Sequence, residues 1–385
     1  MSGQTRLLLV GGGHTHLEIL RRKALEPLPG VALSLVSAVS RHHYSGMVPG
    51  FLAGMYSEAD IAFDLASLTA RAGGTFLEAK AAALDPARCI VRLEDGREIG
   101  YDLVSFGIGS DTRGSGRDAV AERAELVKPI HRAVALRQRI SALAARASRE
   151  PVRAAVVGAG AAGIELACAM AAVFDRARQP REIEVLEASE RILAGYSRRF
   201  VRKTREVLRE KRISVRTGAR ARSVSSESVD LEDGSSVPSE LTVWLTGPEA
   251  YGVFRESGLP LDDRGFLLTD DSLRSIGDPR VYAVGDCGTL AHHPATPKAG
   301  VYAVREGPVL WESLKAALAG GRLPRYEPQK GFLSILNTAD GKALLRYGPL
   351  VSYSRWAWLL KDRIDRGFMR RYQSLPPGPA PRTSR

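Results

Sequence analysis

Apolar and polar positions form two similar series along the chain. In the first series, short apolar runs predict buried strands, and one stretch with apolar residues three and four apart predicts a helix. These elements are strands over 7–10, 31–36 and 101–106, and a helix near 17–22. The segment 45–50, Ser-Gly-Met-Val-Pro-Gly, holds too much glycine and proline for regular structure.

The second series repeats the first. A helical stretch over 119–149 leads to a second glycine-rich turn, a helix over 164–173, and strands over 183–186 and 241–245. A further apolar strand, 281–284, ends in Gly-Asp and is expected to return to the first unit. The pattern predicts an α/β protein with two Rossmann-like units, the second inserted in the first, and a C-terminal helical segment.

The repeat also sets the expected boundaries. We expect residues 1–115 and 276–325 to form the first unit, and residues 116–275 the inserted unit. Residues 326–373 are expected to form the C-terminal region. The proline-rich residues 374–385 are expected to be a disordered tail.

Each unit opens with a glycine-rich turn between a strand and a helix. Such a turn lets the free N–H groups at the helix start hold a pyrophosphate. The residues are Gly11, Gly13, His14 and Thr15 in the first loop, and Gly158, Gly160 and Gly163 in the second. Two such loops point to two dinucleotides held face to face, as when a flavin meets a nicotinamide. For the first loop, an ordinary strand–turn–helix remains the alternative.

The first loop departs from the usual dinucleotide pattern. His16 stands where a third glycine is usual, and Ser37, which is not an acid, follows the second strand. Asp286 still favours a flavin site over an ordinary strand–turn–helix, because its carboxylate can accept a hydrogen bond from a ribityl hydroxyl while the following helix start faces phosphate. The other candidates for contact with this cofactor are Pro49, Gly109 and Gly285.

The second loop is complete and is followed by an acid. Glu187 ends the strand over 183–186, where a carboxylate binds the ribose hydroxyls of adenosine and repels a 2′-phosphate. The pattern favours NADH over NADPH, although Ser189 and Arg191 soften the preference because an arginine can bind a phosphate. Gly247, after the last strand of this unit, is a further candidate.

Two charged residues are candidates for the catalytic site. Glu165 lies in the expected first turn of the helix after the second loop, within reach of the nicotinamide amide or the flavin edge. A carboxylate that only complements the helix dipole is the alternative. Lys298 precedes a helix start at Gly300 and Val301, whose positive end would favour a reduced flavin. A plain surface lysine is the alternative.

The remaining chemistry points away from thiols and metals. Cys89, Cys168 and Cys287 form no CxxC pair, which indicates a reducing compartment and structural thiols. The histidines show no metal-binding spacing, so no metal site is expected. No signal peptide precedes the first strand and no apolar run could span a bilayer, so we expect a cytoplasmic protein.

Positive charge gathers at the C-terminal end. The net charge is +12, and residues 351–385 hold eight Lys/Arg against two Asp. Residues 354–372 predict a helix with aromatic and aliphatic residues at four-residue spacing beside arginines, which suits an anionic membrane surface. A helix packed on its own flavin-binding unit, or on a second copy in a homodimer, is the alternative. Nucleic acid is not expected, because no groove of basic and aromatic residues accompanies the charge.

Four segments carry a family resemblance, and they are 11–16, 44–50, 297–305 and 360–366. They resemble the FAD-dependent pyridine nucleotide-disulfide oxidoreductase superfamily, in its type II NADH dehydrogenase-like branch. They are also similar to the flavoprotein domain that occurs fused to selenide, water dikinase. The resemblance implies bound FAD, with Glu165 and the segment Lys298–Val301 close to its isoalloxazine ring.

We therefore expect an FAD-dependent NAD(P)H dehydrogenase, peripheral on the inner face of the cell membrane. Hydride would pass from NADH to flavin N5, and electrons would then pass to an acceptor, which is expected to be a quinone. The alternatives are a soluble flavoprotein reductase with another small or protein acceptor, a sulfide:quinone-like oxidoreductase, and a redox-sensing flavoprotein. The missing polysulfide cysteines disfavour sulfide oxidation.

Overall fold

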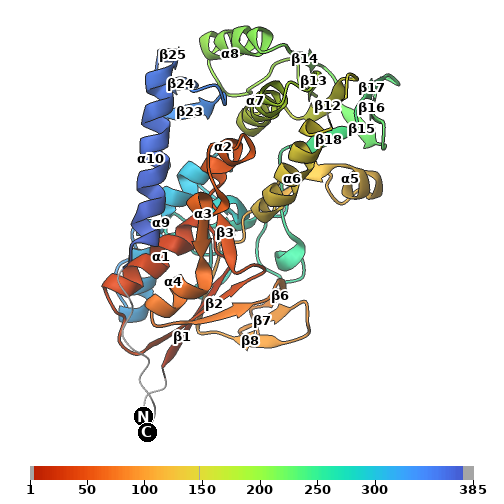
Figure 1. Cartoon of the computed structure of the whole chain (residues 1–385). Helices are drawn as coiled ribbons and strands as arrows, with labels where there is room; N and C mark the ends of the chain where they lie inside the picture. The colour runs from red at the N-terminus through yellow and green to blue at the C-terminus, as the bar shows by residue number, and fades with distance from the viewer. Residues whose placement is uncertain (1–3, 147, 376–385) are drawn as a thin grey trace.

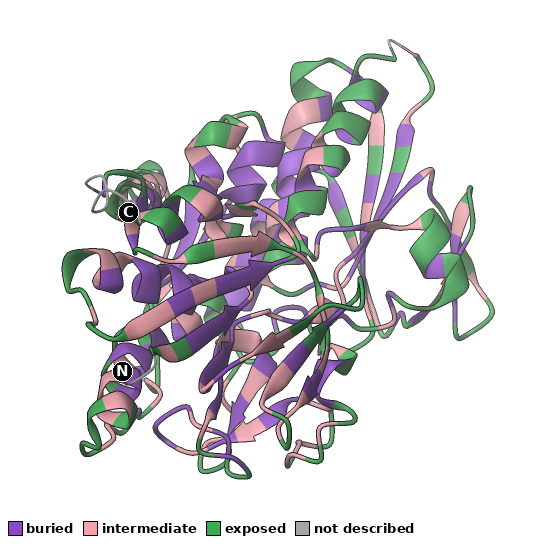
Figure 2. Ribbon diagram, turned by 90° about the horizontal axis from the view of Figure 1, so that it is seen from below, coloured by how far each residue is buried: buried purple, intermediate pink, exposed green. Residues whose placement is uncertain are grey.

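Two parallel five-stranded sheets organise the molecule, and a small antiparallel sheet with a long helix follows them (Figure 1). The computed structural model describes residues 4–146 and 148–375. The central strands of both parallel sheets are largely buried, whereas the outer faces of the helices around them are exposed (Figure 2).

A strand from late in the chain completes the first sheet. Its order is β21 (Val281–Ala283), β9 (Leu103–Phe106), β1 (Thr5–Val10), β2 (Val31–Ser37) and β5 (Thr75–Glu78). Helix α1 (His14–Leu25) follows β1 and packs against α9 (Gly300–Ala319). Because β21 pairs with β9 after the chain has built the second sheet, the predicted insertion is confirmed. We call the elements around this sheet the first unit.

The second sheet repeats the arrangement of the first. Its order is β11 (Glu125–Leu126), β18 (Leu241–Trp244), β12 (Val152–Val157), β13 (Arg181–Glu187) and β14 (Ile213–Thr217), all parallel. Its helices are α5 (Asp118–Arg123), α6 (Ala133–Ala144), α7 (Ala161–Arg176) and α8 (Arg198–Glu210). These elements form the second unit, and the predicted α/β fold with two Rossmann-like units is confirmed.

Each unit also carries an antiparallel three-stranded sheet. In the first unit it is β6 (Ala81–Asp85), β7 (Ile90–Leu93) and β8 (Glu98–Gly100), and in the second unit it is β15 (Ala221–Val224), β16 (Ser228–Leu231) and β17 (Ser236–Pro238). The short pairs are β3 (Arg41–His43) with β4 (Ala62–Asp64), β10 (Asp111–Thr112) with β19 (Pro248–Glu249), and β20 (Leu267–Thr269) with β22 (Gly288–Leu290). The remaining short helices of the first unit are α3 (Glu58–Ile61) and α4 (Leu65–Arg71).

Two predicted segments differ in the structure. Residues 45–50 were expected to be irregular, but they form a 3-10 turn at Ser45–Met47 and the start of helix α2 (Val48–Leu52). Pro49 fits there because the first turn of a helix needs no N–H partner. The expected helical stretch over 119–149 is broken into α5, β11, a 3-10 turn and α6. Pro129 precedes that 3-10 turn, at a point where it disfavours continuous helix.

The C-terminal region holds a sheet that the sequence pattern did not predict. Strands β23 (Ser334–Asn337), β24 (Ala343–Tyr347) and β25 (Leu350–Ser354) are antiparallel and lead directly into α10 (Arg355–Gln373). Figure 1 shows α10 running beside the first unit. Of the expected tail, Leu375 is described and is buried, whereas residues 376–385 lie outside the described residues.

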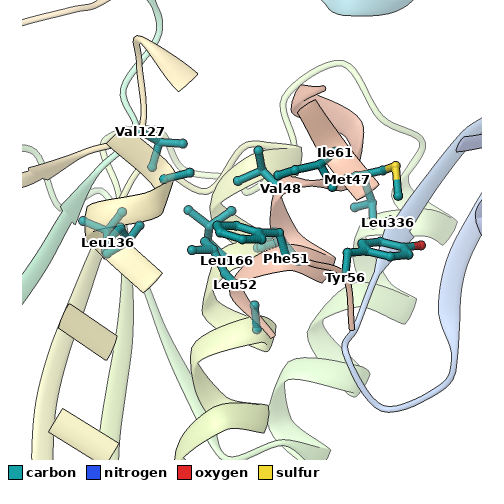
Figure 3. Packing of buried hydrophobic residues seen from close by; sticks show 14 of the residues in the cluster. Met47, Val48, Phe51, Leu52, Tyr56, Ile61, Val127, Leu136, Leu166 and Leu336 are labelled. Atoms are coloured by element: carbon teal, nitrogen blue, oxygen red, sulfur yellow. The ribbon is translucent and has the colours of Figure 1, made fainter. Parts of the chain in front are cut away.

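An apolar core joins the two units and the C-terminal sheet. Phe51 and Leu52 of α2 pack with Leu136 of α6, Leu166 of α7 and Leu336 of β23, and each of these side chains is at most 3% exposed (Figure 3). The guanidinium of Arg137 lies over the Phe51 ring at 4.4 Å. Helix α2 therefore holds the first unit against the second.

We predict that Phe51→Ala lowers the free energy of unfolding by about 3–5 kcal/mol, because it removes a buried ring and leaves a cavity at this junction. The measurement is a urea titration followed by far-UV circular dichroism. The matched control is Leu25→Ala, since Leu25 is 54% exposed, and it should change the stability by less than about 1 kcal/mol. Equal losses in both variants would contradict the role given to α2.

Candidate functional site

The first glycine loop lies where strands of the first sheet end. Gly11 follows β1, and its N–H donates to the carbonyl of Val36 at 2.7 Å. The N–H of Gly13 donates to the carbonyl of Gly107 at 3.1 Å, and a Cβ on Gly13 would lie 2.5 Å from that oxygen. Gly11 has a φ of +90°, which side chains rarely adopt. The loop therefore keeps its shape only with glycine at both positions.

Two helix starts converge beside this loop. Thr15 of α1 donates a hydrogen bond from Oγ1 to the carbonyl of Ala303 in α9 at 2.7 Å. A Cβ on Gly300, the first residue of α9, would lie 3.6 Å from the His14 ring. His14 Nε2 is buried and has no hydrogen-bond partner within the described residues. Burial lowers the pKa of His14 to about 4, so the ring is neutral at pH 7.

Of the two departures from the usual pattern, His16 has a structural explanation. His16, in the place of the third glycine, is buried with Nδ1 2.6 Å from the carbonyl oxygen of Gly11 and Nε2 2.9 Å from Oγ of Ser105. The histidine therefore ties the glycine loop to β9. Ser37 is buried at the end of β2.

Asp286 is held in a network that sequence reasoning found only in part. Its Oδ2 accepts hydrogen bonds from Oγ of Ser110 at 2.8 Å and from Nζ of Lys128 at 2.9 Å. Although burial acts in the opposite direction, Lys128 lowers the pKa of Asp286. Gly109, next to Ser110, has a φ of +74°. Lys128 was missed because only the fold brings it to the end of β21.

Lys298 is half-buried beside the start of α9. Its ammonium donates to the carbonyl of Gly288 and to Oγ1 of Thr289, and lies 4.4 Å from the centre of the Phe266 ring. Burial lowers the pKa of Lys298. It is therefore not a plain surface lysine, and its contact with a flavin stays a prediction. Val301 is the second residue of α9.

The second glycine loop and its acid lie together at the end of the second sheet. A Cβ on Gly163 would lie 1.9 Å from the carbonyl oxygen of Gly158, whereas a Cβ on Gly160 would have no atom within 4 Å. Glu187 accepts hydrogen bonds from the N–H of Ala159 at 2.9 Å and of Ser189 at 2.9 Å. The carboxylate therefore borders the loop. Gly247, after β18, accepts a hydrogen bond from the N–H of Arg113 at 2.8 Å.

Glu165 lies where α7 meets the C-terminal sheet. Helix α7 begins at Ala161, so Glu165 occupies its second turn, which corrects the expected first turn. Its Oε1 accepts a hydrogen bond from the N–H of Asn337 in β23 at 2.7 Å. Burial raises the pKa of Glu165 to about 7. A carboxyl group in that environment can hold or release a proton near neutral pH.

A buried ion pair on α10 lies near Glu165. Nζ of Lys361 lies 2.9 Å from Oδ2 of Asp365 and donates to the carbonyl of Gly46 at 2.9 Å. The hydroxyl of Tyr44 donates to Asp365 at 3.3 Å. Although burial lowers it, the carboxylates of Asp365 and Glu165 raise the pKa of Lys361. The sequence pattern did not distinguish Lys361 from the arginines of this helix, although the fold buries it.

Helix α10 has one packed face and one exposed apolar face. On the packed face, the Phe368 ring stacks on Tyr44 at 4.6 Å, and the Tyr372 hydroxyl donates to Glu18 at 3.3 Å. On the outer face Trp356, Leu359 and Ile364 are 49%, 57% and 45% exposed. The helix therefore packs on its own first unit, as the alternative expectation held, and still leaves an apolar stripe uncovered.

The cysteines form no disulfide bond with one another. The three cysteines are free, and burial raises the pKa of Cys168 to about 12 and that of Cys287 to about 11. Over residues 4–146 and 148–375, no cluster of His, Cys, Asp and Glu has the arrangement of a metal site. In the same part of the chain, no helix is long and apolar enough to cross a membrane.

A family model and curated relatives point to the same family of proteins. The model of the pyridine nucleotide-disulphide oxidoreductase family matches residues 5–307. The type II NADH:quinone oxidoreductase of Mycobacterium tuberculosis is 24% identical over 386 residues, which cover 92% of this chain and 82% of that protein. A probable NADH dehydrogenase of Dictyostelium discoideum is 30% identical over 222 residues, 53% of this chain, and the chain spans about half of its length (49%).

Solved structures share the fold over nearly the whole chain. The sulfide:quinone oxidoreductase of Aquifex aeolicus has a TM-score of 0.81 at 15% identity, covering 98% of this chain and 93% of that one. NDH2 from Plasmodium falciparum, in complex with NADH, has a TM-score of 0.76 at 14% identity, covering 97% and 99%. At these identities the likeness concerns the fold.

Proposed function

Because the chain belongs to the pyridine nucleotide-disulphide oxidoreductase family, we propose that it is an FAD-dependent NADH dehydrogenase whose acceptor is a quinone. The observation that carries the proposal is the pair of glycine loops, each at the end of a parallel sheet and held together by one core. The name of the Mycobacterium tuberculosis relative, a type II NADH:quinone oxidoreductase, supports both the donor and the acceptor.

The residues of the first loop fit a flavin dinucleotide. The start of α1 offers free N–H groups to a pyrophosphate, and the unpartnered Nε2 of His14 can bond to the cofactor. Asp286 can accept a hydrogen bond from a ribityl hydroxyl, and Ser37, the last residue of β2, would contact the adenosine ribose. The remaining contacts would come from Pro49, Gly109, Gly285, Gly300 and Val301.

The residues of the second loop fit NADH better than NADPH. Glu187 borders Gly158 and Gly160 and can bind two ribose hydroxyls, whereas a 2′-phosphate would meet its negative charge. When bound, FAD would supply the two-electron redox chemistry that links NADH to the acceptor. The two glycine loops would align the two cofactors.

Glu165 and Lys298 are the proposed catalytic residues. With a pKa near 7 and a fixed hydrogen bond to Asn337, Glu165 can hold a proton beside the cofactors. Lys298 and the start of α9 place positive charge where a reduced, anionic flavin would need it. The ring of Phe368 on α10 stacks on Tyr44, so an aromatic contact joins this helix to the first unit beside the proposed site.

The outer face of α10 supports attachment to an anionic membrane. Among the described residues, six of the eight exposed large apolar side chains lie in the C-terminal sheet region or on α10, namely Leu333, Tyr347, Leu350, Trp356, Leu359 and Ile364. Arg355, Arg363, Arg370 and Arg371 lie beside them, exposed and without an ion pair among the described residues. Such a surface suits the cytoplasmic interface of a membrane. A quinone dissolved in the bilayer would be within reach from there.

A sulfide:quinone-like activity is the second candidate, because the Aquifex aeolicus fold match is close. The buried Cys168 and Cys287 disfavour it, since their raised pKa values keep both thiols protonated. A soluble reductase or a redox sensor would turn over more slowly with quinones than the proposed enzyme, and would not bind membranes.

We predict that the purified protein is yellow and contains FAD that acid releases. NADH should bleach the flavin absorbance under anaerobic conditions, and menadione should restore it. Steady-state turnover should be faster with NADH than with NADPH, and sulfide should not replace NADH. A protein that takes up no FAD on reconstitution would contradict the proposal.

We predict that Glu187→Ser with Ser189→Arg reverses the nucleotide preference. The change removes a hydrogen-bonded carboxylate and adds a phosphate partner, so NADH use should lose about 1.5–3 kcal/mol in kcat/KM. The control is Glu182→Ser on the same strand, since Glu182 is exposed and paired with Arg153. Unchanged selectivity in the double variant would place Glu187 away from the ribose.

We predict that Trp356→Ser, Leu359→Ser and Ile364→Ser together abolish binding to vesicles with 30% phosphatidylglycerol. FAD content should stay normal, because the packed face of α10 is untouched. Ile276→Ser, at an apolar residue exposed elsewhere, is the control. If the triple variant still sediments with vesicles and instead changes from dimer to monomer in light scattering, the face is a contact between copies.

A further inference from the structure

We propose that Glu306 positions the Gly285–Asp286 turn and makes flavin binding weaken as the pH rises through neutrality. The inference rests on the proposed function, because Asp286 is the acid proposed for the ribityl chain. Glu306 was not among the residues that the sequence singled out, since nothing in the pattern of α9 distinguishes it from a surface acid.

A hydrogen bond joins Glu306 to the turn. Its Oε2 accepts from the N–H of Gly285 at 2.5 Å, although the two residues lie on different elements. Gly285 has a φ of +64° and directly precedes Asp286, so the bond fixes the backbone that presents the Asp286 carboxylate. The Glu306 side chain is only 6% exposed. If it lost this acceptor, the N–H of Gly285 would be left without a partner from α9.

Helix α9 is held close to α1 near this contact. A Cβ on Gly307 would lie 2.7 Å from Cβ of Glu18, so α9 and α1 touch closely at this point. Thr15 also bonds to the carbonyl of Ala303 one turn earlier. Glu306 therefore connects two parts of the proposed flavin site, the glycine loop before α1 and the turn after β21.

Several charged or titratable groups surround the Glu306 carboxyl. They are Asp286 and Cys287 from the turn, Lys298 before α9, and Tyr326 after it. His293 and Tyr302 line the same cavity as Glu306, and Glu18 of α1 lies against the next residue, Gly307. Glu18 is paired with Arg21 and Arg22, and Asp286 with Lys128. Lys298 and Glu306 also line a cavity of about 20 Å³, which is room for one water molecule.

These surroundings give the carboxyl a titration near neutral pH. Burial raises the pKa of Glu306 to about 7, and the negative Asp286 adds to this effect while Lys298 opposes it. Below that pH the group is neutral, and above it a second carboxylate stands beside Asp286. FAD brings two negative phosphates to the start of α1, so bound FAD favours the protonated form of Glu306.

The sign of the pH effect follows from this preference. If bound FAD raises the pKa of Glu306, binding takes up a proton, and affinity falls as pH rises above the pKa of the free protein. For each unit by which bound FAD raises the pKa of Glu306, binding at high pH is weaker by up to tenfold. Above the pKa of the complex, the loss reaches a plateau.

The experiment titrates full-length apoprotein with FAD from pH 6 to pH 8.5 and follows the quenching of flavin fluorescence. Wild type should lose about tenfold in affinity over this range relative to Glu306→Gln. That variant keeps an acceptor for the Gly285 N–H but carries no charge. The control is Glu312→Gln on the same helix, where the side chain is half exposed, and it should follow wild type. Parallel curves for wild type and Glu306→Gln would overturn the proposed charge effect.

A second measurement tests the positioning role without FAD. Hydrogen exchange of the peptide that spans residues 284–289 in the apoprotein should be slow in wild type and in Glu306→Gln. In Glu306→Ala it should be at least tenfold faster, with the exchange of β1 unchanged as a check on folding. Equal protection in the alanine variant would overturn the positioning role. Failure of wild type to bind FAD, with this exchange result intact, would instead contradict the proposed function.

Discussion

The packing of α2 between the two parallel sheets is the contact on which the rest of the site depends. Each glycine loop takes its shape from its own sheet, but the distance between the loops depends on the Phe51 and Leu52 side chains against α6 and α7. Interiors pack closely, so a core of this kind transmits small shifts instead of absorbing them. Two cofactors that must meet at van der Waals distance need such a junction.

Helix α10 contributes both to the proposed flavin site and to the exposed apolar surface. Its inner residues, Lys361 and Asp365, form a buried pair that bonds to Gly46 and Tyr44, and its outer residues face solvent. Removing one member of a buried pair leaves an uncompensated charge. The position of the outer face is therefore fixed by contacts beside the proposed flavin site, and the helix does not behave as a detachable anchor.

The features that were predictable from the sequence are those that depend on backbone geometry. The tight turns at Gly11, Gly13, Gly158 and Gly163 were predictable because they exclude side chains, and so was the place of Glu187 at the end of a strand beside the second loop. Lys128, Glu306 and Asn337 were missed, since each acts through a partner distant in the sequence. The burial of Lys361 was missed for the same reason, because a helical pattern does not say which face a partner covers.

The late position of β21 has a consequence for how the protein is made. Every strand of the second sheet lies between residues 125 and 244, so that sheet can form before the ribosome has released residue 281. The first sheet cannot be closed until β21 emerges, although β1 is synthesised first. During synthesis the exposed edge of β9 must wait for its partner, and unpaired strand edges invite aggregation. The insertion that brings the two loops together therefore also delays completion of the first sheet. A chaperone would be most useful to this chain between the synthesis of β9 and that of β21.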